Sequence, residues 1–595
     1  MTDPTHHPRP SLRRPFELLD GVWQFSLDVD HQWQGPAEVP FETEIVVPFA
    51  PETPASGIRA DTVRRCWYRR SLDTGGVGAD DRQVVAFGAV DRHATVWANG
   101  EIVATHTGGY TPFEADVTDA ARRGDGIVDL VVRADDEPAA LEAPRGKQDW
   151  RDDPHAVWYP RTSGIWRTVF AERTGTCHIA SIDVAGDPAE MTMTVRSRIE
   201  GRPPAGLCAV LRVTGESSGR VFVDDRISLP GHELERTFAI GDGGLDDAWT
   251  LPWWPRMPHL FTVTMTLVDG NDRECDTAET TAALRTVSVT DNQICLNGRP
   301  YPLRLVLDQG YWPHTGATPP SLDAIRTDIE LTRRLGFNGA RIHQKTHDPR
   351  YFAVADRAGL LSWVEMPSAY RAGTTSTTNL LREWADIVAA HRGFPSVVAW
   401  VPVNESWGVP AVAVDQRQRA LLRALTEITG ALDGSRPVSA NDGWETDGGD
   451  IVGIHDYTQD ADRLVERYGT ADAIAGLLRG VRPDGRAADL DHAPLGSRAA
   501  VLSEFGGVAR RADTNGSKTS LGANGGAWGY DDVATPEQFV ERYRALWAAV
   551  HESDTLAGAC WTQLTDTYQE VNGLLTADRV PKADLESLAD ATRGR

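Results

Sequence analysis

The most constraining feature of the sequence is a series of eight short apolar runs after residue 300, separated from one another mostly by amphipathic stretches of helical period. Such alternation predicts βα units around a parallel sheet. Eight units over about 300 residues is the size of a TIM barrel. The predicted strands are PYPLRLVLD, GFNGARIHQ, GLLSWVEM, VVAWVPVNE, RPVSAND, DIVGIHDY, AAVLSEF and LAGACWTQL.

Three of the intervening stretches predict helices most clearly. In SLDAIRTDIELTRRL, Ser321 can cap the helix and the apolar side chains fall close to one stripe. QRQRALLRALTEITGAL and PEQFVERYRALWAAVHE show the same spacing. The barrel is therefore predicted over residues 289–595.

The preceding half of the chain has a different texture, with short alternating strands between turn signals and no need for a long helix. Residues 1–175 predict a β jelly-roll sandwich, in which Asn99-Gly100 marks a two-residue hairpin. Residues 176–288 predict a smaller immunoglobulin-like β-sandwich. We expect a multidomain protein with two β-sandwiches followed by a (β/α)8 barrel.

Composition limits the partners and the compartment. The formal charge is 60 − 85 = −25, which disfavours nucleic-acid backbones and anionic membranes as partners. The six cysteines lack metal-site spacing, there is no apolar signal segment and no run of about 18 apolar residues, so we expect a cytoplasmic protein. Nineteen tryptophans suit sugar faces as well as ordinary cores.

Two glutamates stand out among the polar residues that end the predicted strands. Glu405 and Glu504 each terminate an apolar run, where a carboxylate is costly to bury without a use. On the fourth and seventh strands they would face each other across the barrel mouth. Opposed carboxyls about 5 Å apart are what a retaining glycosidase needs, and mutual repulsion is expected to keep one of them protonated.

Several segments carry a resemblance to a known family. PSVVAWVPVNESWG and VLSEFGG resemble the acid/base and nucleophile strands of glycoside hydrolase family 2, the β-galactosidase and β-glucuronidase superfamily. LLDGVWQFSLD, VDRHATVWANGEIVATHTGGYTPFEADV and RTSGIWRTV resemble its N-terminal sugar-binding domain. RIHQKTHDPRYFAVADRAGLLSWVEMP and CWTQLTDTYQEVNGLLTADRVPK resemble other barrel segments. The resemblance covers about residues 12–585 and implies an exo-acting retaining glycosidase that needs no cofactor. The sequence has no clear counterpart of the magnesium ligands of the large galactosidases, so no metal is expected.

The resemblance also implies residue roles. Glu405 would be the general acid/base, and Asn404 would bind the sugar hydroxyl next to the reacting carbon. Glu504 would be the nucleophile that forms a covalent glycosyl-enzyme. Tyr457 would lie close to the nucleophile, and Trp561 would form the floor of the pocket. The partner is then an oligosaccharide or glycoside, with a homo-oligomer possible.

Departures from the family pattern bear on the sugar. Gln344 stands where relatives carry a histidine, and Asn572-Gly573-Leu574 lacks the lysine with which glucuronidases hold a sugar carboxylate. An acidic sugar is therefore disfavoured. The expected glycone is less common, such as a β-galactofuranoside or an α-L-arabinofuranoside, in a pocket shaped by Asp308, His343, His455 and Asp456.

Three other readings stay open at this point. A TIM-barrel metallohydrolase usually carries His-x-His on its first strand, where this chain has Leu307-Asp308-Gln309. A serine hydrolase would need Gly215–Gly219 in a strand-to-helix elbow, but this motif joins two predicted strands. A non-catalytic carbohydrate-binding protein on a hydrolase scaffold would normally have lost one of the two glutamates.

Overall fold

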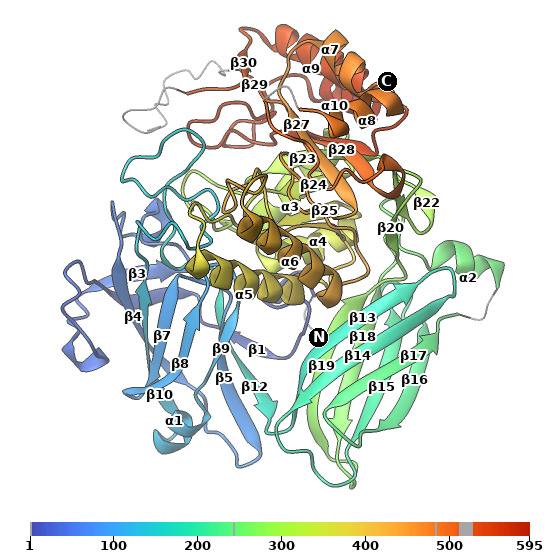
Figure 1. Cartoon of the computed structure of the whole chain (residues 1–595). Coiled ribbons are helices and arrows are strands. Elements are labelled where there is room, and N and C mark those ends of the chain that lie inside the picture. Colours follow the sequence, from blue (N-terminus) through green and yellow to red (C-terminus); the bar gives the residue numbers. More distant parts are fainter. Residues whose placement is uncertain (1–2, 242–243, 482–484, 511–526) are drawn as a thin grey trace.

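The computed structural model describes residues 3–241, 244–481, 485–510 and 527–595. Figure 1 shows three bodies in chain order: a blue β-sandwich, a cyan-to-green β-sandwich, and a yellow-to-red α/β body that lies over both. The three predicted fold classes are confirmed. The boundaries predicted after residues 175 and 288 stay predictions, as does the cytoplasmic location.

The first sandwich consists mainly of a four-stranded and a six-stranded antiparallel sheet, in the orders β1-β12-β5-β9 and β3-β2-β4-β10-β7-β8. The predicted hairpin joins β7 to β8, and Asn99 and Gly100 both have positive φ, 51° and 85°. The elements are β1 Phe16–Leu18, β2 Gly21–Leu27, β3 Thr43–Val47, β4 Arg65–Asp73, β5 Asp81–Phe87, β6 Val90–Asp91, β7 His93–Ala98, β8 Glu101–Thr107, β9 Phe113–Asp116, α1 Thr118–Arg123, β10 Ile127–Asp135, β11 Gly164–Ile165 and β12 Val169–Gly175.

The second sandwich packs a three-stranded sheet, β13-β14-β17, against a four-stranded one, β16-β15-β18-β19. Alternate residues of these strands are buried, which is the period expected of a sheet with one wet face. The Gly215–Gly219 motif lies in the turn between β15 and β16, so it has no elbow. The elements are β13 His178–Asp187, β14 Thr192–Glu200, β15 Cys208–Gly215, β16 Val221–Ser228, β17 Glu233–Ala239, α2 Leu245–Thr250, β18 Phe261–Val268 and β19 Glu274–Ala282.

The third body is built on a parallel sheet in the order β26-β25-β24-β23-β31-β28-β27. Its strands are almost wholly buried because helices cover the outside and side chains fill the inside. A small sheet, β20-β21-β22, precedes it. The strands are β20 Val287–Thr290, β21 Gln293–Leu296, β22 Arg299–Pro300, β23 Leu303–Asp308, β24 Gly339–Ile342, β25 Leu361–Glu365, β26 Val397–Val401, β27 Ile451–Asp456, β28 Ala499–Gly506, β29 Val508–Ala509, β30 Asp531–Asp532 and β31 Gly558–Thr562.

The fifth predicted barrel strand, RPVSAND, does not form a regular strand. It instead makes isolated parallel bridges, Trp400↔Val438 on the β26 side and Ser439↔Ile451 on the β27 side, which close the barrel. Pro437 has no N–H to give to a ladder, and the segment pairs with the β26 side again only at Asp442, whose N–H donates to Val403 O, so the pairing is reduced to isolated bridges. The prediction of a strand is therefore wrong, although the segment occupies the fifth position.

The helices of the barrel follow the predicted apolar stripes. Ser321 caps α3 by accepting a hydrogen bond from the N–H of Ala324, and α6 and α9 coincide with the two other predicted stretches. Among the described residues no helix is long and apolar enough to cross a membrane. The helices are α3 Leu322–Arg334, α4 Pro349–Ala358, α5 Thr374–His391, α6 Gln416–Leu432, α7 Ala461–Tyr468, α8 Ala471–Arg479, α9 Pro536–His551 and α10 Leu585–Arg593.

Candidate active site

Glu405 and Glu504 meet at the carboxyl ends of the barrel strands. Glu504 lies within β28, and Glu405 lies four residues beyond the end of β26. One donor atom from each of Glu405, Glu504 and His455 lies within 4.8 Å of the others. The two carboxylates therefore share one space, at the separation that a retaining glycosidase requires.

The backbone around Glu405 has an uncommon conformation. β26 ends at Val401, and Glu405 and Ser406 have φ of 50° and 55°, which non-glycine residues rarely adopt. Hydrogen bonds hold the turn: Glu405 N–H donates to Asp442 O at 2.9 Å, and Ser406 N–H donates to Asn441 Oδ1 at 2.9 Å. The fifth-position segment thus fixes the orientation of Glu405.

A buried arginine on β24 connects the carboxylates. Arg341 pairs with Glu504 at 2.7 Å, with Asp442 at 2.8 Å and with Glu365. Although burial alone would lower the pKa of Arg341, these three carboxylates raise it well above its usual range. Arg341 is therefore a fixed cation beneath Glu504. Its role was not predicted from the sequence, although a charged residue inside an apolar run is a detectable signal.

Glu365 and His343 form the next layer around Arg341. Burial raises the pKa of Glu365 to about 7, against the opposing charge of Arg341. His343 Nδ1 lies 3.1 Å from Glu365 and 3.9 Å from Glu504. Burial and the charge of Lys147 lower the pKa of His343 well below its usual value, so its ring is neutral.

His455 lies between the two candidate catalytic carboxylates. Its Nδ1 is 2.8 Å from Glu405, and its Nε2 is 3.4 Å from Glu504 and 3.3 Å from Asp442. Burial would lower the pKa of His455, but these carboxylates raise it to about 9. Burial likewise would raise the pKa of Glu405, but His455 lowers it to about 2.

The protonation expected from the sequence is thereby corrected. Repulsion between two carboxylates was expected to keep one of them protonated, but the cations Arg341 and His455 compensate both charges. In the free protein the proton nearest Glu405 resides on His455, across a hydrogen bond of 2.8 Å.

Two further predicted residues lie in the same cluster. The hydroxyl of Tyr457 donates a hydrogen bond to Glu504 Oε2. Asn404 accepts from Arg341 at 2.7 Å through Oδ1, while its buried Nδ2 has no hydrogen-bond partner among the described residues. An unsatisfied amide donor beside Glu405 is what binding of a sugar hydroxyl requires.

Three predicted residues, Asp308, Trp561 and Asp456, do not join the cluster. Asp308 pairs with His347 at 2.9 Å and accepts from the N–H of Gly310. Trp561 is fully buried and packs against Phe505 and against Tyr543 of α9, with ring centroids 5.2 and 4.5 Å away. Neither side chain has a described contact with Glu405 or Glu504. Asp456 also points elsewhere, since its carboxylate binds Arg467 and Tyr468 of α7.

A loop of the first sandwich reaches the strand ends and was not found by sequence reasoning. Gly146 N–H donates to Ser368 O at 3.1 Å, Tyr370 donates to Gly146 O at 2.7 Å, and Gln569 donates to the carbonyl of Trp158 at 2.8 Å. These bonds attach residues 145–159 to the loops that follow β25 and β31. We call this segment the capping loop.

Aromatic rings of the capping loop and the barrel form one connected, half-exposed surface. Trp158 has its ring centroid 5.5 Å from Tyr370 and 5.8 Å from Trp407. Trp407 donates its N–H to Glu405 Oε2 at 3.3 Å. The surface therefore begins at Glu405 and leads outward. We call it the aromatic wall; its members are Trp150, His155, Trp158, Tyr370, Trp407 and Trp444.

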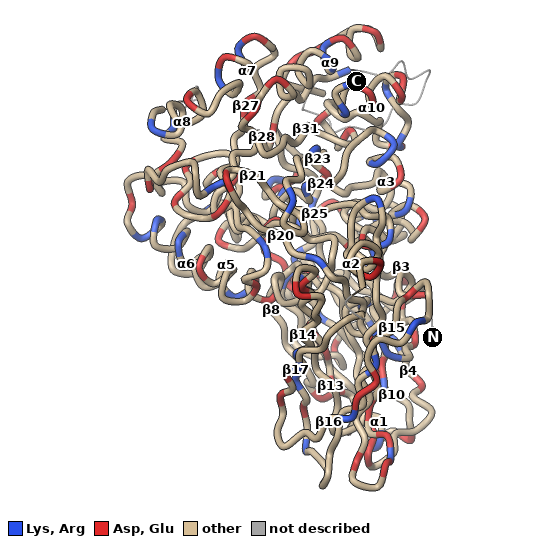
Figure 2. Tube along the Cα trace, turned by 90° about the vertical axis from the view of Figure 1, so that its right-hand side faces the viewer, with Lys and Arg blue, Asp and Glu red and all other residues tan. Residues whose placement is uncertain are grey.

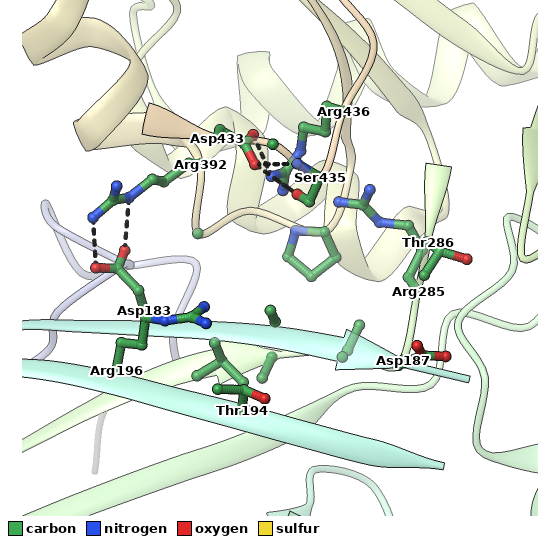
Figure 3. Close-up of a pocket in the computed structure, with 18 of the residues that line it drawn as sticks. Asp183, Asp187, Thr194, Arg196, Arg285, Thr286, Arg392, Asp433, Ser435 and Arg436 are labelled. Carbon is green, nitrogen blue, oxygen red and sulfur yellow. Dashed lines mark hydrogen bonds and ion pairs between the residues drawn. The ribbon is translucent and has the colours of Figure 1, made fainter. Parts of the chain in front are cut away.

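A separate cavity of about 680 Å³ lies between the second sandwich and the barrel (Figure 3). It lies at the amino ends of the barrel strands, because its barrel residues precede β26 and the fifth-position segment. Arg392 spans it and binds Asp183 with two hydrogen bonds of 3.0 and 2.7 Å. Three of the arginines that line this cavity, Arg196, Arg392 and Arg436, pair with carboxylates of the protein, and the cavity lies between two domains on the far side from Glu405.

Comparison with known proteins agrees with this geometry. The profile of "glycosyl hydrolases family 2, sugar binding domain" matches residues 16–173, and that of "glycosyl hydrolases family 2, TIM barrel domain" matches residues 287–472. The chain is 24% identical to a β-glucuronidase of Paenibacillus borealis over 73% of this chain and 74% of that protein. It is 25% identical to a β-galactosidase of Thermoanaerobacter pseudethanolicus, covering 62% of this chain but 48% of that protein.

Solved structures show the same fold. A β-glucuronidase from an uncultured Clostridium superposes with a TM-score of 0.74 at 18% identity, covering 98% of each chain. A β-galacturonidase of Eisenbergiella tayi, solved with glycerol, superposes with a TM-score of 0.73 at 19% identity, covering 98% of this chain and 97% of that one.

Fold and site together define a multidomain barrel hydrolase that acts on sugars. The chain belongs to glycosyl hydrolases family 2 and is a glycosidase similar to the β-glucuronidases and β-galactosidases of that family.

Proposed function

We propose that this protein is an exo-acting, retaining glycoside hydrolase in which Glu504 is the nucleophile and Glu405 the general acid/base. The observation that carries the proposal is the approach of Glu405 and Glu504 to within 4.8 Å in one space at the carboxyl ends of the strands. The capping loop covers part of that space, which favours removal of a terminal sugar over cleavage inside a chain.

The proposed reaction has two steps. Glu504, held by Arg341 and Tyr457, attacks the anomeric carbon while the leaving-group oxygen receives a proton through Glu405. In the free protein that proton resides on His455, which supplies it to Glu405. In the second step Glu405 removes a proton from water, and the resulting attack releases the sugar with retained configuration.

The two sides of the site have separate roles in this proposal. A general acid lies on the leaving-group side, and Trp407 connects Glu405 to the aromatic wall. The aglycone therefore lies along that wall. The sugar ring lies on the side of Glu504 and Asn404, whose free Nδ2 donates to a hydroxyl of the glycone.

The proposed glycone remains a furanoside such as a β-galactofuranoside or an α-L-arabinofuranoside. The support is that the sequence departs from the family pattern at Gln344 and at Asn572-Gly573-Leu574. The side chain of Gln344 accepts a hydrogen bond from the hydroxyl of Tyr370 at 3.2 Å. A panel of nitrophenyl pyranosides and furanosides tests this part directly.

The catalytic proposal is tested by two alanine variants. We expect Glu504→Ala to lower turnover of the best aryl glycoside by about 10⁴-fold or more, and azide to restore it by forming a glycosyl azide of inverted configuration. Glu405→Ala should spare substrates with good leaving groups far more than poor ones, since good ones need little protonation. Near-normal activity of Glu504→Ala, or equal losses of Glu405→Ala on both substrates, contradicts the assignment.

The same measurements separate the competing readings. A carbohydrate-binding protein without activity would bind sugars but cleave no glycoside in the panel. A metallohydrolase would lose activity on exhaustive chelation. Glu405, His455 and Glu504 offer a donor set for a metal ion, but a protonated His455 has no lone pair to give and Arg341 already occupies Glu504. We expect chelation to leave activity unchanged.

A further inference from the structure

Lys147 of the capping loop lies over the barrel mouth in a pair that the reaction above does not use. Its buried ammonium is 3.8 Å from Glu570, and no other described residue lies within hydrogen-bond or ion-pair distance of Nζ. Tyr159 completes the group, because its hydroxyl donates to Glu570 at 3.0 Å and its ring centroid is 5.6 Å from Nζ. An ammonium has three donors, so Lys147 retains donors for a ligand.

Both members of the pair are held in place by other groups. Gln563 donates to the second oxygen of Glu570 at 3.3 Å. Lys147 is fixed through its backbone, since its carbonyl accepts from the N–H of Tyr159 at 2.7 Å and the adjoining Gly146 is bonded to Ser368. The pair is therefore preorganised, which reduces the entropy lost when a ligand binds.

The position of the pair assigns it to the sugar side of the site. Glu570 follows β31, the eighth barrel position, whereas Trp407 and the inner end of the aromatic wall follow β26, the fourth position on the opposite side. Burial and His455 have the largest effects on the pKa of Glu405, and the charge of Lys147, which lowers this pKa, has the next largest. Burial in turn raises the pKa of Glu570, and the negative charges of Glu504 and Glu405 help to raise it with smaller effects.

The balance of charge around this space disfavours an anionic sugar. Five carboxyl groups belong to this network, those of Glu365, Glu405, Asp442, Glu504 and Glu570, although burial raises the pKa of Glu365 to about 7, so Glu365 does not count as a full negative charge. Three cations oppose them, Arg341, His455 and Lys147, while His343 is neutral. A uronate would add a further negative charge next to Glu570. A neutral sugar adds none.

We propose that Lys147 and Glu570 select a neutral glycone by binding two of its hydroxyls that are remote from the reacting bond. The ammonium donates to one hydroxyl oxygen while the carboxylate accepts from the other, so a pair of hydroxyls satisfies both partners at once. The assignment of the sugar side rests on the proposed function, whereas the pair itself is a property of the free protein. Lys147 of this pair then comes from the first sandwich, whereas Glu570 and the catalytic groups come from the barrel.

The test is binding of free sugars by the full-length protein, measured by calorimetry. The probes are galactose, glucose, mannose and arabinose together with glucuronic and galacturonic acids, and then the deoxy derivatives of the neutral sugar that binds most tightly. We expect that neutral sugar to bind at least about 10-fold more tightly than either acid. We expect Lys147→Met and Glu570→Gln each to weaken its binding by about 10- to 100-fold.

The decisive readout is coupling between the protein and the sugar. Removing one hydroxyl should weaken binding to the wild type by about 10-fold or more but change binding to Lys147→Met little, because the partner of that hydroxyl is already gone. Arg123→Met on the exposed α1 is the matched control and should bind like the wild type. Three outcomes each overturn the proposal. The first is that the losses from Lys147→Met and from removing a hydroxyl are additive for every deoxy sugar. The second is tighter binding of a uronic acid that Lys147→Met abolishes, and the third is that the wild type binds no sugar. Sugar binding with coupling but without any hydrolysis would instead leave the pair standing and refute the catalytic proposal.

Discussion

At the scale of single residues, the site is governed by how its cations compensate its carboxylates. Arg341 cannot lose its proton under ordinary conditions, so it provides a permanent positive charge 2.7 Å from Glu504. His455 differs because its proton can move to Glu405 across 2.8 Å. Two acids that would repel each other in isolation are thereby held close together at neutral pH.

This arrangement predicts a shift in the pH profile of a His455→Gln variant. The pKa of His455 is raised to about 9, so the wild type should lose kcat/KM as pH rises past about 9 and the proton is lost. Without His455 the proton must be held by Glu405 itself, and the alkaline limb should move to lower pH by at least about two units. Equal alkaline limbs in the two proteins would contradict the role of His455.

The stability of the same two proteins provides the control. The folded-state pKa of His455 lies above its ordinary value of 6.5, so its stabilising effect is fully present below pH 6.5 and is lost as pH rises through about 9. The free energy of unfolding of the wild type should fall by about 1–3 kcal/mol more over this window than that of His455→Gln. Denaturant titrations of both proteins below pH 6.5 and above about pH 9 measure the difference.

At the scale of elements, the sequence pattern predicts most of the barrel because buried parallel strands and amphipathic helices have distinct periods. It fails at the fifth position, where the apolar run is short and Pro437 has no N–H to donate, so the backbone makes isolated bridges in place of a continuous ladder. It also places Glu405 at a strand end, whereas the residue lies in a strained turn beyond β26. Strand-end reasoning still located both glutamates, since these departures are local.

The capping loop provides an element-scale prediction. Gly146 has φ of 57°, and a Cβ at this position would lie 2.0 Å from Gln344 O, so Gly146→Ala should displace the loop from the barrel. We expect kcat/KM to fall by about 10- to 100-fold with little change in global unfolding. Gly75→Ala, at φ of 62° with no atom within 4 Å of its Cβ, imposes similar backbone strain without a clash and should retain activity. Equal effects of the two variants would show that strain, and not loop docking, is responsible.

At the scale of the whole molecule, the site is assembled from parts that are distant in the sequence. Lys147 and Trp158 come from the first sandwich and meet barrel residues more than 200 positions further along. Periodicity and motif spacing describe neighbours along the chain, so neither residue could be recognised in advance. Acidic and basic residues are interspersed along the traced chain (Figure 2), and among the described residues that view shows no long unbroken stretch of basic positions.

The aromatic wall gives the last prediction, because it exists only where the first sandwich and the barrel meet. Trp158 connects its inner and outer members, with ring centroids 4.7 Å from Trp150 and 5.8 Å from Trp407. A planar aglycone would bury apolar area against these rings, whereas a methyl group would bury little. Trp158→Ala should therefore raise KM for a nitrophenyl glycoside by about 10-fold while changing KM for the methyl glycoside of the same sugar far less. Trp249→Ala on the exposed face of α2 removes the same side chain far from the strand ends and should change neither value. An equal rise in KM for both substrates would mean that Trp158 supports the capping loop without contacting the aglycone, and the leaving group would then have to lie elsewhere.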